Sequence, residues 1–185
     1  MITPEVAAAV AGGAALVSSF AAAFTAIRQG RMNRQLVKLQ QINIERREFR
    51  DGLLLLGATS RVVAERGDEL CAALRTAAAT GEVRPKFEAF SAAAEYLLQA
   101  WTTFSTRVEP SAFGEVRESI SHALEAAEGA RLGWLVMTSD GPPTARQTLA
   151  GYADTASRWS AECRRMCATG AQASGVLIAR QPVIA

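Results

Sequence analysis

The stretch that decides the fold class is Phe87 to Phe104, which reads FEAFSAAAEYLLQAWTTF. Its apolar side chains return at alternating three- and four-residue steps, which is the spacing of one face of an α-helix and not the two-residue repeat of a strand. The residues on this face are Phe87, Phe90, Ala94, Leu97, Trp101, Phe104 and, one turn further on, Val108. A helix with one apolar face buries it against other helices, so the stretch predicts a helical bundle.

A long helix is expected before this stretch, from about Met32 to about Thr80, with Gly81 as its end and Pro85 in the first turn of the next helix. Its apolar stripe consists of Phe49, Leu53, Leu56, Ser60, Val63, Gly67, Leu70, Leu74 and Ala77. Gly67 followed by Asp68 could mark a stop and a new N-cap. We favour a helix that continues through this point.

Two more helices are expected after it. Pro110 ends the central helix and Ser111 can cap the next one, while Thr144 with Gln147 forms a capping box for the last. Their stripes are Phe113, Val116, Ile120, Ala123, Ala127 and Trp134, and then Leu149, Tyr152, Ala156, Trp159, Cys163, Met166 and Gly170. Short connections favour an antiparallel, up-and-down bundle of roughly four helices over residues 49–174, with a tail at 175–185.

The N-terminal segment from Val6 to Ile27 holds 22 residues without a charge. As a helix it would be roughly 33 Å long, enough to cross a hydrocarbon core of about 30 Å. A secretory signal would need a basic start, whereas this chain offers Glu5, and a soluble core helix is the other alternative because ten of the 22 residues are Ala. We predict a single, uncleaved transmembrane anchor over residues 1–28.

Basic residues follow this segment, first at Arg28 and then in a juxtamembrane region expected at residues 29–48, and none precedes it. They are Arg28, Arg31, Arg34 and Lys38, with no acid between them. Positive charge beside a span stays on the cytoplasmic side, so the short N-terminus is expected outside the cell membrane and residues 28–185 in the cytosol. The same cluster is expected to contact anionic lipid headgroups. Three cysteines, an odd number, agree with a reducing compartment.

Small residues four apart occur inside the predicted span, as Ala8 with Gly12 and Ala9 with Gly13. This spacing lets two transmembrane helices approach closely. Together with the long helix, it predicts a homo-oligomer held by the span and by coiled-coil contacts.

The chain shows no strong enzymatic motif. It lacks a Gly-rich phosphate loop, a G-x-S-x-G elbow and an H-E-x-x-H pair. Cys163 and Cys167 share a helix face, but nothing in the spacing brings Cys71 and His122 to them, so no metal and no cofactor is expected. The net charge of +2 is too small to indicate a nucleic-acid partner.

One short motif suggests an alternative. The sequence RESISH places His122, the only histidine, after Arg117 with four residues between them. An Arg followed by His at this spacing in a helical bundle resembles the signature of HEPN ribonucleases. The resemblance implies RNA cleavage by paired Arg and His residues of a dimer, with His moving a proton and Arg stabilising phosphate charge. Glu118 departs from the pattern, because that family often has a small polar residue after the Arg.

The sequence thus predicts an all-α chain with one transmembrane helix, a long helix and a cytosolic bundle. Its expected role is a non-enzymatic, self-associating interaction or scaffold module that binds the lipid bilayer and an unidentified protein partner. A membrane-tethered HEPN-like ribonuclease that uses Arg117 and His122 is one alternative. A membrane-perturbing effector assembled through the transmembrane helix is the other.

Overall fold

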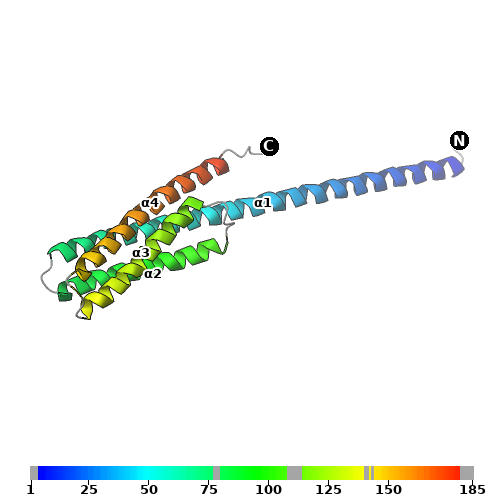
Figure 1. Ribbon diagram of the computed structural model, residues 1–185. Coiled ribbons are helices and arrows are strands. Elements are labelled where there is room, and N and C mark those ends of the chain that lie inside the picture. The colour runs from blue at the N-terminus through cyan, green and yellow to red at the C-terminus, as the bar shows by residue number, and fades with distance from the viewer. Residues whose placement is uncertain (1–3, 77–79, 108–113, 140–141, 143, 180–185) are drawn as a thin grey trace. The chain divides into compact units, whose positions relative to one another are not determined.

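The computed structural model confirms an all-helical chain of four helices, with no strand in the residues it describes. These are residues 4–76, 80–107, 114–139, 142 and 144–179, and side chains are described within these ranges from residue 28 to residue 173. The helices are α1 (Pro4–Thr76), α2 (Thr80–Ser105), α3 (Gly114–Thr138) and α4 (Ala145–Ala179) (Figure 1).

Helix α1 runs without interruption from Pro4 to Thr76, so it passes through Gly67 as the sequence favours. The predicted anchor and the predicted long helix are therefore parts of one helix. Helix α2 already begins at Thr80, which places Gly81 in its first turn and Pro85 in its second, later than expected. Proline is tolerated this close to a helix start because only one backbone hydrogen bond is lost there.

The chain divides into two compact units, Met1–Glu45 and Arg46–Ala185. In the first unit every side chain from residue 28 to residue 42 is exposed. Where side chains are described, no helix is long and apolar enough to cross a membrane. Residues 6–27 and their small-residue pairs, Ala8 with Gly12 and Ala9 with Gly13, lie outside that part of the chain.

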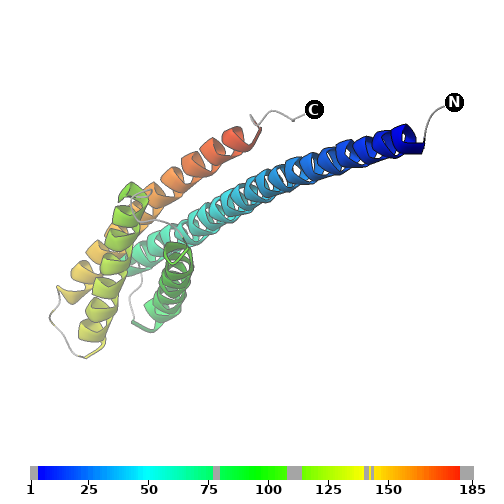
Figure 2. The same ribbon diagram turned by 90° about the vertical axis from the view of Figure 1, so that its right-hand side faces the viewer.

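The second unit is a four-helix bundle in which neighbouring helices alternate in direction (Figure 2). Helix α1 contacts α2 at both ends of their shared length, where Glu69 meets Lys86 and Gly52 meets Phe104. Helix α3 packs along α4 and also contacts α2. Hydrogen bonds from α1 to α4, such as Ser60 to Cys163, close the ring of four helices.

The core confirms the predicted stripes of α1 and α2. Their described members are buried except for Phe49 and Trp101, which are partly buried and pack against the core. Phe90, Leu56, Val63, Leu70 and Leu97 are fully buried. Val108, Ser111 and Phe113 fall outside the described residues. Helix α4 begins directly after Thr144, as the capping box predicts, and continues to Ala179, past the expected end near Ser174.

The buried face of α4 confirms the predicted Leu149, Ala156 and Cys163 but differs from the prediction at Tyr152. Tyr152 was expected on it but is 41% exposed, and the centre of the face is formed by small side chains. These are Ala153, Ala156, Ser160, Cys163 and Cys167. The reason lies on α1, because a Cβ added to Gly67 would come within 3.0 Å of the Ala153 carbonyl oxygen and one added to Gly57 within 3.3 Å of the Cys167 Cβ. The two backbones approach too closely for large side chains between them.

Candidate interaction surface

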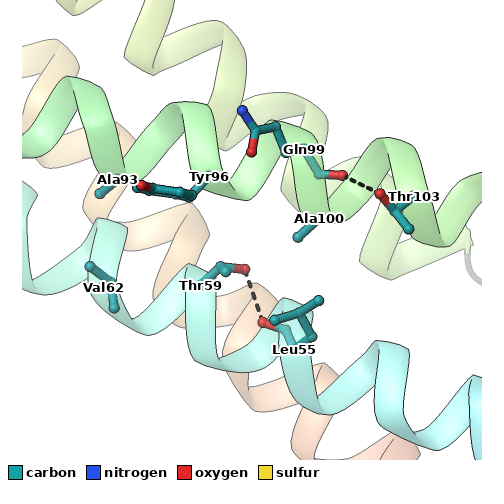
Figure 3. Close-up of a pocket in the computed structure, with 8 residues that line it drawn as sticks. All are labelled: Leu55, Thr59, Val62, Ala93, Tyr96, Gln99, Ala100 and Thr103. Carbon is teal, nitrogen blue, oxygen red and sulfur yellow. Dashed lines mark hydrogen bonds between the residues drawn. The ribbon is translucent and has the colours of Figure 1, made fainter.

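An open groove lies between α1 and α2 on the outer surface of the bundle (Figure 3). We call it the α1/α2 groove; its volume is about 380 Å³. Its lining consists of Leu55, Thr59 and Val62 from α1, and Ala93, Tyr96, Gln99, Ala100 and Thr103 from α2. Ala93 and Ala100 are buried and form the floor, whereas Leu55, Val62 and Tyr96 are 51%, 41% and 66% exposed and form the walls.

The groove offers few free polar groups, because its threonine hydroxyls are bonded to their own helices. Thr59 Oγ1 donates to the carbonyl oxygen of Leu55 at 3.0 Å, and Thr103 Oγ1 donates to that of Gln99 at 2.9 Å (Figure 3). An intrahelical bond of this kind turns the hydroxyl toward the backbone and satisfies it. The Gln99 amide and the Tyr96 hydroxyl remain as the polar groups of an otherwise apolar surface.

The spacing of the lining residues fits the side chains of another helix. On α1 the lining residues are four and three positions apart. On α2, Ala93, Tyr96, Ala100 and Thr103 are three, four and three positions apart, with Gln99 beside them. Each helix therefore presents a second stripe beside the one buried in the core. Two neighbouring stripes with small residues between large ones form holes that a third helix can fill with its own ridges.

Residues 28–45 of α1, in the first unit, carry several exposed large apolar side chains. Met32 and Leu36 are 54% and 52% exposed, and Val37, Leu39, Ile42 and Ile44 are also exposed. The predicted headgroup contacts Arg28, Arg31, Arg34 and Lys38 are all exposed on the same helical segment. No ion pair is formed by these four cations within the described residues.

Arg117 and His122 are not brought together within one chain. They lie about 140° apart around α3 at roughly 100° per residue, Arg117 is exposed, and His122 is half-buried. The His122 ring packs on Trp159, with ring centroids 4.7 Å apart, and its two nitrogens lie 3.8 Å from the carboxylates of Glu118 and Glu125. Two carboxylates beside the imidazole make this surface unfavourable for an RNA phosphate.

The cysteines are free thiols in the core. Cys163 Sγ lies 3.9 Å from Cys167 Sγ and accepts a hydrogen bond from Ser60 Oγ at 3.2 Å. The hydrogen bond with Cys163 and burial raise the pKa of the Cys167 thiol. Cys71 bonds to the Ala150 carbonyl, roughly 20 Å along α4 from Cys163. No group of three or more metal-ligating side chains is present in the described part of the chain.

The α1/α2 groove was not predicted, although its signal is in the sequence. Leu55, Val62 and Tyr96 flank the core stripes at helical spacing, so the apolar arc of each helix is wider than one neighbour can cover. The most regular apolar stripe of each helix accounts for the core and leaves out the second stripe that lines the groove.

No protein-family model, no curated protein and no solved structure matches this chain.

Proposed function

We propose that this protein is a membrane-anchored helical module that associates with itself and recruits a partner protein through the α1/α2 groove. The partner would contribute an amphipathic helix whose apolar face fills the groove. The observation that carries the proposal is the apolar groove itself, with Leu55, Val62 and Tyr96 exposed around a floor of alanines. Helix-in-groove binding uses apolar anchors at this spacing.

The anchor is proposed from the sequence, because residues 6–27 carry no charge and basic residues follow them. In this arrangement the short N-terminus is outside the cell membrane and the bundle is in the cytosol. The exposed Arg28, Arg31, Arg34 and Lys38 would lie at the headgroups of the inner leaflet. In this proposal the groove has a structural, non-enzymatic role and binds its partner through a mostly apolar lining.

The groove is tested by placing a photo-crosslinking amino acid at Leu55 in cells and the same amino acid at Arg165, an exposed control on α4. We expect a discrete adduct from position 55 only. Adding Tyr96→Glu should abolish that adduct while leaving the thermal unfolding of the bundle unchanged. An adduct that persists with Tyr96→Glu, or that forms equally from position 165, would refute groove binding.

The anchor is tested by extracting membranes with alkaline carbonate and by treating intact cells with protease. The full chain, with a C-terminal tag, should stay in the membrane pellet, and the tag should be protected from protease added outside. Release by carbonate removes the anchor, whereas digestion of the tag reverses the orientation.

A further inference from the structure

We infer that α1 pairs with α1 of a second copy, in parallel and in register, through the face formed by Met32, Leu36, Leu39 and Asn43. The inference deepens the proposed self-association and rests on it, but it does not depend on the groove. It is argued from the spacing of these residues, from the unpaired Asn43 amide oxygen and from the position of the basic residues.

The four residues follow the heptad repeat of a coiled coil. Their steps of four, three and four place Leu36 and Asn43 at a positions and Met32 and Leu39 at d positions. Met32, Leu36 and Leu39 are exposed, and no side chain from residue 28 to residue 42 is covered by the described part of this chain. A helix without tertiary packing is marginally stable in water, so we expect another molecule to pack on this segment.

Asn43 indicates that the helix packed on this face is α1 of another copy of the chain. Its Oδ1 is shielded from solvent and accepts no hydrogen bond from the described residues. An unpaired buried amide oxygen is unfavourable. In a parallel, in-register pair, an a-position Asn lies opposite the same Asn of the partner helix, and the two amides can bond to each other. This device fixes the register and the number of helices in a coiled coil.

The charges on this segment leave most of the face accessible to a second helix. Arg31, Arg34 and Lys38 are more than about 100° from the centre of the face at roughly 100° per residue. From residue 33 to residue 42 the positions beside the face are uncharged: Asn33, Gln35, Gln40 and Ile42. Arg28, one turn before Met32, lies about 50° from the centre of the face at roughly 100° per residue. The uncharged border from residue 33 to residue 42 leaves room for a second helix without repulsion between like charges.

The same register continues toward the N-terminus in the sequence. Its next a and d positions are Gln29, Thr25, Ala22, Ser18, Ala15, Ala11 and Ala8. From Thr25 onward all are small, which is the composition that lets two helices pack closely in lipid. The face proposed for the aqueous segment therefore extends in the sequence to Ala8, whereas Ala9, Gly12 and Gly13 fall at b, e and f positions outside it.

The inference is tested on the full chain in detergent by disulfide formation under mild oxidation. Leu36→Cys should form a disulfide-linked dimer in most molecules, because in-register a positions face each other. Gln41→Cys, on the opposite side of the helix and exposed, is the matched control and should not. The native cysteines are buried and should not contribute. Little linkage at position 36, or equal linkage at 36 and 41, would overturn the parallel pair.

Asn43 is tested by measuring the mass of the full chain. We expect a dimer for the wild type, a mixture that includes higher oligomers for Asn43→Leu, and at least a tenfold larger dissociation constant for Leu36→Asp. Thermal unfolding of the bundle should not change in either variant, since both positions lie in the other unit. An Asn43→Leu chain that stays a clean dimer overturns the role of Asn43. If Leu36→Cys forms the disulfide-linked dimer but the photo-crosslinker at position 55 gives no adduct, self-association stands and the recruitment of a partner through the groove is refuted.

Discussion

At the scale of single residues, the bundle contains two buried serines of α4 in opposite situations. Ser157 Oγ lies 2.6 Å from Asp68 Oδ1 and 3.1 Å from the Ala64 carbonyl oxygen, so its hydroxyl has acceptors on α1. Ser160 Oγ is fully buried and has no hydrogen-bond partner in the described residues. A buried hydroxyl without a partner retains the cost of its desolvation, whereas a bonded one recovers it.

Ser160→Ala should therefore raise the free energy of unfolding by about 1 kcal/mol, because it removes an unsatisfied polar group. Ser157→Ala should lower it by about 1–3 kcal/mol, since it takes away the donor that Asp68 accepts from. Urea unfolding followed by circular dichroism measures both changes. If the two variants moved stability in the same direction, the different hydrogen bonding of the two serines would not govern their energetics.

Cys71 gives the bundle a dependence on alkaline pH. Burial, and after it the Asp154 carboxylate, raises the pKa of the Cys71 thiol above its ordinary value of 9.0. A thiol whose pKa is higher in the folded state contributes stability that is complete below the unfolded-state pKa and is lost as the pH rises above it. We expect the free energy of unfolding to fall from about pH 8.5 upward, toward about 1.4 kcal/mol per pH unit for this one group.

The check compares the wild type with Cys71→Ala between pH 7 and pH 9.5. The variant should be less stable at pH 7, because it loses buried volume, but its stability should decline less steeply with pH. Parallel pH curves for the two proteins would show that ionisation of Cys71 is not linked to folding.

At the scale of helices, the close approach of α1 and α4 depends on glycine. Gly67 of α1 has no space for a methyl group, because the Ala153 carbonyl oxygen and the Ser157 Cβ would lie 3.0 Å and 3.1 Å from it. A Cβ added to Gly151 of α4 would have no neighbouring atom within 4 Å. The first contact involves backbone, which cannot move without shifting a whole helix.

Gly67→Ala should lower the free energy of unfolding by about 1–3 kcal/mol through overpacking. Gly151→Ala, the matched control, should raise it by about 0.5–1 kcal/mol, because alanine has the higher helix propensity and meets no neighbour. Thermal or urea unfolding distinguishes the two. A Gly67→Ala protein as stable as the Gly151→Ala protein would mean that the helices separate at little cost.

The sequence predicts those helices whose buried face is made of large side chains. Phe87, Phe90 and Leu97 recur so regularly that α2 and its core face follow from spacing alone. For α4 the prediction holds at Leu149, Ala156 and Cys163 but fails at Tyr152. The packing of alanine, serine and cysteine is decided by Gly57 and Gly67 on another helix, which no local pattern reveals. The α1/α2 groove likewise exists only once two helices are paired.

At the scale of the whole molecule, the chain consists of two units, and only the second contains the hydrophobic core of the described residues. The core residues lie between Leu53 and Ala171, all within Arg46–Ala185. The described side chains before residue 46 take no part in that core. The bundle is thus expected to carry its own stability, while the first unit depends on lipid or on a second copy.

Removal of residues 1–45 should leave a folded bundle. We expect one cooperative thermal transition with a midpoint within about 5 °C of that of the full chain, equivalent to about 1–2 kcal/mol for a domain of this size. The near-ultraviolet signal of Trp134, which stacks on Phe87 at 4.5 Å, should persist. A broad transition without this signal would show that the N-terminal unit is needed to fold the bundle.

The pairing of α1 with α4 also determines when the bundle can be completed during synthesis. Contacts within the α1–α2, α2–α3 and α3–α4 hairpins join neighbouring elements, but those from Ser60 to Cys163 and from Ala64 to Ser157 span 103 and 93 residues. Until α4 leaves the ribosome, Ser60 and Gly67 of α1 lack their α4 neighbours Cys163 and Ala153. A nascent chain halted after α3 therefore exposes the α4-facing side of α1 to chaperones and proteases. A chain that lacks its N-terminal residues but contains α4 does not expose this side.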